Sequence, residues 1–143
     1  APMIFTKSIL DGKKIKIFNN GDMYRDFTYI DDVIESIYRC CFKPATIDNN
    51  FNSLTPNPSS SFAPFRVFNI GNNSPVNLLY FIETLEKNLG KKAIKEYKPM
   101  QIGDVVSTYA DTSMLQEWIK YCPKTSIENG VKKFTNWYLN YFS

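Results

Sequence analysis

Arg25 is the residue of this sequence whose surroundings most clearly suit a chemical task. It follows a polar turn and lies between two aromatic residues, Tyr24 and Phe27. A guanidinium group stays charged at any relevant pH, and its planar fork matches the oxygens of a phosphate. We therefore consider Arg25 a candidate ligand of a diphosphate. The alternative is a surface arginine that pairs with Asp22 or Asp26, and these residues alone leave both interpretations open.

The composition excludes much catalytic chemistry. The 143 residues include no histidine, so this chain alone cannot form a Ser-His or Cys-His pair or a metal site with imidazole ligands. The three cysteines lack a C-x-x-C spacing, and a structural zinc site is not expected. Cys40 and Cys41 are neighbours in a helical pattern and point in different directions, which favours free thiols and a cytoplasmic protein. Any reaction must use Tyr, Lys, Asp or Glu, or residues outside this sequence.

The charge and hydropathy exclude two further classes of partner. The net charge is only +3, from 17 basic and 14 acidic residues, and lysines form isolated doublets such as Lys13-Lys14. The sequence therefore does not predict nucleic-acid binding. No apolar run approaches the roughly 18 residues of a membrane span, and no signal peptide is recognisable. The length is that of one domain, or of one domain's share of a longer chain. Because the chain begins Ala-Pro within a helical pattern, we expect a truncated protein.

The elements that must position Arg25 alternate between helix and strand. Pro2 and Gly12 mark the two ends of a predicted helix. Residues 15–18 alternate as in a strand with two different faces. The Asn-Asn-Gly-Asp sequence that follows is rich in residues that tolerate positive φ, so a turn is expected there. Arg25 should therefore lie just after a strand and a tight turn.

The next helix is predicted from about Asp32 to Phe42, with Asp31 as its N-cap. Acidic side chains stabilise the N-terminus of a helix, so capping is favoured over catalysis for the Asp31-Asp32 pair. The i, i+3, i+4 spacing of apolar residues predicts a buried face made of Val33, Ile34, Ile37, Tyr38 and Cys41.

The rest of the chain continues the alternation. Residues 45–64 are rich in Asn, Ser and Pro without a sustained period, which predicts a mobile surface loop. The patterns then predict a strand at 65–71, a helix at 75–89 capped by Ser74 and Gly90, a short strand at 93–97, a helix at 112–121 and a C-terminal helix opened by a capping box at 125–128. The class is α/β or mixed α+β, with too few strong strands for a complete doubly wound sheet. We expect a lobe that sits on another domain.

Three motifs then occur in order: Arg25-Asp-Phe-Thr-Tyr-Ile-Asp-Asp32, Phe68-Asn-Ile-Gly-Asn-Asn-Ser-Pro-Val76, and Gln101-Ile-Gly-Asp-Val105 with Tyr109-Ala-Asp111. Together they resemble the C-terminal part of extended short-chain dehydrogenase/reductase proteins, the NAD-dependent nucleotide-sugar epimerases and dehydratases. With Met100 before the third motif and Thr112-Ser after it, the sequence looks most like the UDP-glucuronate 4-epimerase branch. The resemblance covers nearly the whole chain apart from residues 45–64.

This resemblance implies roles for five residues. In the related epimerases the strand that matches residues 15–18 lies along the uracil, so the Lys16 backbone would hydrogen-bond the base and Phe18 would pack against it. Arg25 matches the arginine that clamps the diphosphate. Gln101 stands where galactose epimerases carry a second diphosphate arginine, which implies a weaker or replaced contact. Asp104 matches an acid that is ribose-binding or structural, and the alternative is a simple turn residue.

The resemblance also implies what this sequence lacks. The family binds the NAD pyrophosphate with a glycine-rich turn and uses a Tyr-x-x-x-Lys pair, in which the lysine lowers the tyrosine pKa. Neither pattern occurs here, so no catalytic, cofactor-binding or metal-binding residue is predicted. Residues 1–143 are expected to form the UDP-sugar-binding C-terminal domain of an NAD-dependent epimerase, inactive alone. NAD would be held by an N-terminal Rossmann domain, absent from this chain.

The implied reaction is the interconversion of UDP-glucuronate and UDP-galacturonate, and the complete protein is expected to be a homodimer. Two alternatives stay open. One is a nucleotide-sugar dehydratase or reductase of the same superfamily. The other is a non-catalytic α/β binding module.

Overall fold

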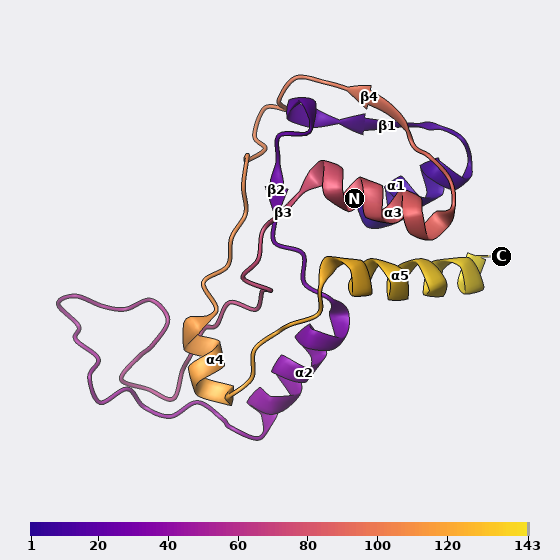
Figure 1. Cartoon of the computed structure of the whole chain (residues 1–143). Coiled ribbons are helices and arrows are strands. Elements are labelled where there is room, and N and C mark those ends of the chain that lie inside the picture. Colours follow the sequence, from indigo (N-terminus) through magenta and orange to yellow (C-terminus); the bar gives the residue numbers. More distant parts are fainter. Residues whose placement is uncertain (143) are drawn as a thin grey trace. The chain divides into compact units, whose positions relative to one another are not determined.

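The computed structural model describes residues 1–142 and divides them into two compact units. Unit 1 comprises residues 1–27, 74–109 and 125–142, and unit 2 comprises residues 28–73 and 110–124. Helices outnumber strands, and all strands are short (Figure 1). The predicted class, a mixed α/β lobe with only part of a sheet, is confirmed. No helix among the described residues is long and apolar enough to cross a membrane.

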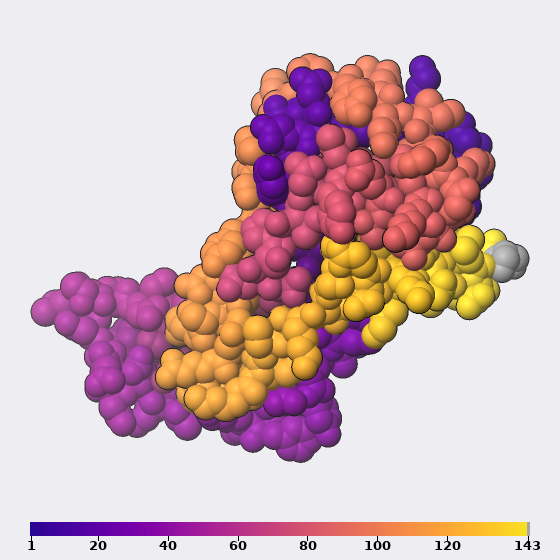
Figure 2. Space-filling model, viewed as in Figure 1, coloured from indigo at the N-terminus to yellow at the C-terminus, as the bar shows by residue number. Residues whose placement is uncertain are grey.

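Unit 1 contains two small sheets and three longer helices. Its elements are α1 (Pro2–Leu10), β1 (Lys14–Ile17), the 3-10 turn η1 (Phe18–Gly21), β2 (Tyr24–Arg25), β3 (Val76–Asn77), α3 (Leu78–Leu89), β4 (Ile94–Tyr97) and α5 (Ile127–Phe142). β1 pairs with β4 in parallel, and β2 pairs with β3 antiparallel. Helix α3 contacts both α1 and α5, and the close packing of the α3 and α5 atoms is visible in Figure 2.

The core of unit 1 is apolar. Strand β1 buries Ile15 and Ile17 and exposes the lysines between them, as its period of two predicts. These two side chains join a cluster with the inner faces of the helices, namely Ile9, Met23, Leu78, Phe81, Ile82, Leu85 and Val131. Fully burying an aliphatic or aromatic side chain contributes roughly 1.5–3 kcal/mol. Unit 1 therefore has a hydrophobic core of its own.

The predicted turn after β1 forms, and it depends on its residue types. Asn19 and Asn20 have φ angles of 48° and 50°, and Gly21 has a φ of 87°. A Cβ atom at Gly21 would lie 2.7 Å from side-chain atoms of Leu79. Glycine is thus required both for the backbone conformation and for the close approach of α3. The turn carries the chain from β1 to Arg25 in β2.

Two predicted helix starts in unit 1 are shifted. Val76 and Asn77 are extended because they pair with β2, so α3 begins only at Leu78. Its cap is therefore Asn77, whose side chain accepts a hydrogen bond from Leu79 N at 2.9 Å, and not Ser74. Likewise α5 begins at Ile127, and Ser126 Oγ accepts from the backbone N of Asn129 at 3.3 Å. The predicted capping box was one residue out of register.

Unit 2 contains helices α2 (Ile30–Cys41) and α4 (Ser113–Ile119), which contact each other. Residues 45–64 form the predicted loop, with turns and a single bridge from Ser60 to Arg66. The mobility of this loop stays a prediction. The strand predicted at 65–71 does not form beyond that bridge, because the described part of unit 2 offers no second strand to pair with it. Cys40, Cys41 and Cys122 are free thiols.

Helix α2 differs from its prediction in two ways. It begins at Ile30 after Tyr29, so Asp31 lies inside the first turn and is not the N-cap. Its buried residues are Asp32 and Ser36, whereas Ile34, Ile37 and Tyr38 are 56%, 52% and 58% exposed. The apolar spacing correctly indicated one continuous face, but nothing in the described part of unit 2 covers it.

Candidate functional site

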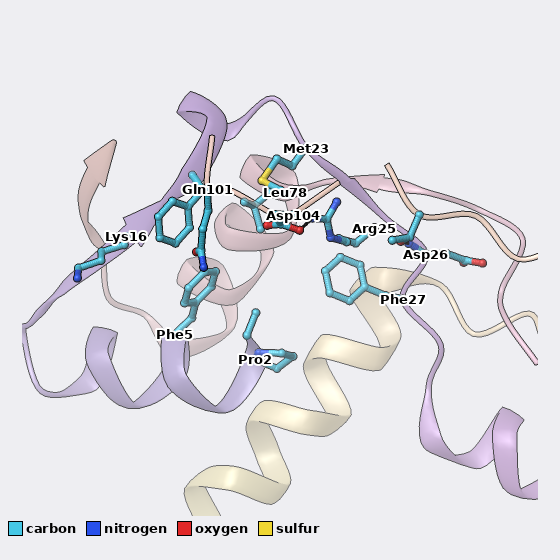
Figure 3. Close-up of a pocket in the computed structure, with 13 residues that line it drawn as sticks. Pro2, Phe5, Lys16, Met23, Arg25, Asp26, Phe27, Leu78, Gln101 and Asp104 are labelled. Carbon is cyan, nitrogen blue, oxygen red and sulfur yellow. Dashed lines mark hydrogen bonds and ion pairs between the residues drawn. The ribbon is translucent and has the colours of Figure 1, made fainter. Parts of the chain in front are cut away.

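A cavity of about 490 Å³ in unit 1 is lined by all five residues singled out from the sequence. Lys16 comes from β1, Phe18 from η1 and Arg25 from β2, while Gln101 and Asp104 follow β4 (Figure 3). Parallel pairing of β1 with β4 brings the chain after β4 back to the end of β1, where Lys98 N donates to Ile17 O at 2.8 Å. Segments about 80 positions apart in the sequence thereby share one wall.

The Arg25 guanidinium is held by three acceptors. Nη1 donates to the backbone oxygens of Tyr24 at 2.9 Å and Val106 at 3.1 Å, and Nη2 donates to Asp104 Oδ1 at 2.8 Å. The side chains of Arg25 and Asp104 are 23% and 36% exposed. The carboxylate that pairs with Arg25 is therefore that of Asp104, a partner which the sequence alternative of Asp22 or Asp26 did not include.

Asp104 is fixed by its own turn. Its backbone N donates to Gln101 O at 3.2 Å, and Gly103 adopts a φ of 84°. Val105 N donates to the same Oδ1 that accepts from Arg25, at 2.9 Å. Asp104 is thus a turn residue, as the simpler interpretation had it, and also the ion-pair partner of the arginine.

The edge of β1 that carries Lys16 is open. Ile17 O accepts from Lys98 N, so the polar backbone groups of Ile17 face the β4 side. Successive residues of a strand direct these groups to opposite edges. The N–H and C=O of Lys16 therefore point away from β4, and no other strand among residues 1–142 pairs with β1 there.

The remaining lining is largely apolar and was missed as part of a site. It includes Phe5, Met23, Phe27 and Leu78. Phe27 stacks on the core residue Phe81 with ring centroids 4.5 Å apart. In the sequence these residues look like ordinary core positions, and no signal distinguishes a side chain that fills the core from one that also borders a cavity. Asp26, another lining residue, accepts from Ser74 N at 3.3 Å.

The charged groups of this cavity bear on which ligand it could bind. Lys16 and Arg25 supply two positive charges, and Asp26 and Asp104 supply two negative charges. Among the described residues no group of three or more His, Cys, Asp or Glu side chains could hold a metal ion. An aromatic and apolar wall beside a fixed guanidinium suits a ligand that joins a ring to an anionic group.

Two tyrosines outside the cavity have carboxylate partners that oppose their ionisation. Tyr80 OH donates to Glu128 Oε1 at 2.5 Å, which raises the pKa of Tyr80 and lowers that of Glu128. In unit 2, burial and a 2.7 Å hydrogen bond to Asp32 raise the pKa of Tyr121 to about 12. A tyrosine that acts as a base needs the opposite shift. Neither residue is therefore set up for that role.

Comparison with known proteins connects these features to one family. The NAD dependent epimerase/dehydratase family matches residues 3–71. Protein CapI of Staphylococcus aureus is 48% identical over 138 residues, which are 96% of this chain and 41% of that protein. A probable UDP-glucuronate 4-epimerase of Rhizobium meliloti is 42% identical, over 94% of this chain and 40% of its own length.

The fold has the same relatives. The crystal structure of UDP-glucuronic acid 4-epimerase from Bacillus cereus, in complex with UDP-glucuronic acid and NAD, aligns with a TM-score of 0.77 and 27% identity. The alignment covers 99% of this chain and 40% of that enzyme. The chain thus spans about two fifths of the length of the relatives it matches, and it corresponds to their C-terminal part. Together these similarities support a fragment of an NAD-dependent epimerase of the short-chain dehydrogenase/reductase type.

Proposed function

We propose that this chain is the UDP-sugar-binding part of an NAD-dependent 4-epimerase that interconverts UDP-glucuronate and UDP-galacturonate. The observation that carries the proposal is the cavity of unit 1, where Lys16, Phe18, Arg25, Gln101 and Asp104 come together from separate segments. Relatives named UDP-glucuronate 4-epimerases, at 39% to 42% identity, support the choice of sugar nucleotide.

The uracil would bind along the open edge of β1. The backbone N–H and C=O of Lys16 point away from β4, so a base lying in that plane can both donate to and accept from the strand as a further strand would. Phe18 lines the same cavity and is half-buried, which suits packing against the face of a base.

The diphosphate would bind to Arg25. The guanidinium is already fixed on the cavity wall, so little side-chain entropy is lost when a phosphate binds. Gln101 can donate one neutral hydrogen bond but adds no charge. Because the two carboxylates offset the two cations of this cavity, we expect part of the diphosphate charge to be neutralised by groups outside this chain.

NAD does not fit the residues of this chain. A pyrophosphate cradle needs closely spaced glycines at the N-terminus of a helix. The positive-φ glycines are Gly12, Gly21, Gly90 and Gly103, which are far apart in the sequence, and none begins a helix. We therefore assign cofactor binding to an N-terminal Rossmann domain. The chain would contribute by anchoring the UDP.

The exposed apolar face of α2, made of Ile30, Ile34, Ile37, Tyr38 and Phe42, supports such a partner domain. A contiguous apolar face on a soluble protein commonly marks an interface. With three fifths of the relatives' length outside this chain, the Rossmann domain is the occupant we propose. A homodimer of the complete protein stays a prediction.

Replacing Arg25 tests the binding role. In the complete protein, with its N-terminal domain, Arg25→Ala should raise the Kd for UDP-glucuronate by at least about tenfold, as expected for a charge-assisted hydrogen bond to phosphate. NAD affinity should stay unchanged, as measured by calorimetry. Arg25→Lys keeps the charge but not the planar fork, so its Kd for UDP-glucuronate should lie between those of the unsubstituted protein and Arg25→Ala.

Arg66→Ala in unit 2 is the matched control, because it removes one arginine outside the cavity. The proposal would be wrong if Arg25→Ala bound UDP-glucuronate as tightly as this control.

A further inference from the structure

The ion pair between Arg25 and Asp104 has a specific geometry. A guanidinium carries five N–H donors, and three of those on Arg25 are used by Tyr24 O, Val106 O and Asp104 Oδ1. Both donors of Nη1 are engaged by backbone. One donor on Nη2 and the one on Nε are left for a ligand. Figure 3 shows the carboxylate of Asp104 directly beside the guanidinium on the cavity wall.

The carboxylate of Asp104 can fix the Arg25 guanidinium because the surrounding turn fixes the carboxylate itself. The turn at Gly103 and the bond from Val105 N fix the position of Oδ1. The same short segment then supplies Val106 O to Nη1. The stretch 104–106 thus binds the guanidinium at both of its terminal nitrogens. Since free arginine side chains lose about 2 kcal/mol of rotamer entropy on immobilisation, this contact removes part of that cost before any ligand binds.

We infer that Asp104 is a positioning residue: its carboxylate fixes Arg25 so that the remaining donors can bind the diphosphate, and Asp104 itself contributes little to binding of the nucleoside. This inference rests on the proposed function, because it assumes that Arg25 binds the diphosphate. It differs from a ribose-binding role for Asp104, which would act on the nucleoside. It also differs from competition, in which the carboxylate would occupy the arginine and weaken phosphate binding.

Two substitutions and two ligands separate these three roles. Asp104→Ala removes the acceptor for Nη2, and Asp104→Asn keeps an acceptor oxygen while it removes the negative charge. The ligands are UDP and uridine, whose Kd values are measured by calorimetry in the complete protein. If Asp104 positions Arg25, Asp104→Ala should weaken UDP binding by about three- to tenfold. The loss is smaller than the full cost of immobilising an arginine, because the two backbone oxygens still hold Nη1. Uridine binding should not change, and Asp104→Asn should bind UDP within about twofold of the unsubstituted protein.

Three other results would overturn the inference. Equal losses for UDP and uridine in Asp104→Ala would assign the residue to the nucleoside. Tighter UDP binding by both variants would assign it to competition. The failure of the proposed function looks different, since Arg25→Ala would then leave UDP binding unchanged. If Arg25→Ala weakens binding but Asp104→Ala does not, only the positioning role is wrong.

A measurement without ligand provides an independent check. In the 143-residue chain with 15N-labelled arginine, the Nη protons of Arg25 should exchange slowly with water, because three of the terminal donors are bonded. Asp104→Ala should accelerate the exchange at Nη2, and Asp104→Asn should not. Arg66 is the internal reference for the exchange rate, because it makes one such bond, from Nη1 to Phe65 O, whereas Arg25 makes three. Fast exchange at Arg25 in the unsubstituted chain would contradict a fixed guanidinium.

Discussion

Helix α2 of unit 2 buries a different kind of side chain from the helices that form the core of unit 1. Unit 1 encloses a cluster of aliphatic and aromatic side chains, to which α1, α3 and α5 each contribute. In unit 2, helix α2 buries Asp32 and Ser36 and exposes its isoleucines. Hydrophobic burial is the dominant favourable contribution to folding. The difference indicates that unit 1 has a hydrophobic core of its own, whereas unit 2 leaves the apolar face of α2 exposed.

The largest expected effect is in the core of unit 1. Leu85 is fully buried against the strands and helices of this unit, and Leu85→Ala should lower the free energy of unfolding by about 2–5 kcal/mol, from lost burial and the cavity left behind. Urea unfolding monitored by tryptophan fluorescence measures it. If Leu85→Ala lowered the unfolding free energy no more than a substitution at an exposed position does, a buried core at Leu85 would be contradicted.

A smaller loss is expected at the turn before Arg25. Gly21→Ala places a Cβ at a φ of 87° and within 2.7 Å of Leu79, and should cost about 1–3 kcal/mol. Gly90→Ala is a matched control, because it also has a positive φ, 63°, but its Cβ would contact nothing within 4 Å. The difference in unfolding free energy between the two variants isolates the close approach to α3. No difference would show that the backbone conformation alone requires glycine at position 21.

An acid-dependent effect is expected at Glu86, which is buried in unit 1. Burial opposes its ionisation, but hydrogen bonds from Lys92, Lys95 and Ala93 N outweigh burial and hold the pKa of Glu86 below its ordinary value of 4.5. A lowered pKa stabilises the folded state above the ordinary value, and this stabilisation is lost as the pH falls through the lowered pKa. Unfolding free energy should therefore fall below about pH 4.5.

Glu86→Gln should flatten that part of the pH profile, in urea titrations between pH 3 and pH 7. Glu128→Gln provides the comparison, since the pKa of Glu128 is also lowered but its carboxylate lies at the surface, bonded to Tyr80. An unchanged acid slope in Glu86→Gln would exclude Glu86 as a cause of acid sensitivity.

The smallest effect is expected on the exposed face of α2. Ile37→Glu in this chain should change the unfolding free energy by no more than about 0.5 kcal/mol, as for other surface substitutions. The same substitution in the complete protein should destabilise the junction with the Rossmann domain, visible as a lower Tm. Ile4→Glu, on the exposed side of α1, is the control. Equal effects in both proteins would argue against α2 as the interface.

The sequence predicted the elements of unit 1 well because their signals are local. The period of β1, the Asn-Asn-Gly turn and the glycine after α3 each depend on neighbouring residues, and the structure contains all three. Arg25 was a candidate from its own surroundings, and the other four residues of the candidate site followed from the family resemblance. The pairing of Arg25 with Asp104 could not be predicted from the sequence, because the partners are 79 positions apart and other carboxylates lie closer to Arg25 in the sequence.

The errors in unit 2 share one physical cause. A period of apolar residues indicates that a helix has an apolar face, but it does not indicate what covers that face. The stripe of α2 was therefore predicted as buried, although the unit buries the opposite side. The pattern of segment 65–71 likewise indicates a strand but not whether a second strand is present, and a strand forms only where another lies beside it. In both cases the pattern is present in the sequence, but the described residues of unit 2 include neither a group that covers the face of α2 nor a strand that pairs with 65–71.

The parallel pair of β1 and β4 has a consequence for folding kinetics. Lys14 pairs with Ile94, 80 positions later, so this sheet and the arginine pocket beside it can form only after most of the chain has been synthesised. Closing so long a loop is slow, but its entropy depends only logarithmically on length. Removing ten residues from the loop at 45–64 would change the closure free energy by only about 0.1 kcal/mol. The segment can therefore vary in length with almost no effect on the free energy of closing the candidate pocket.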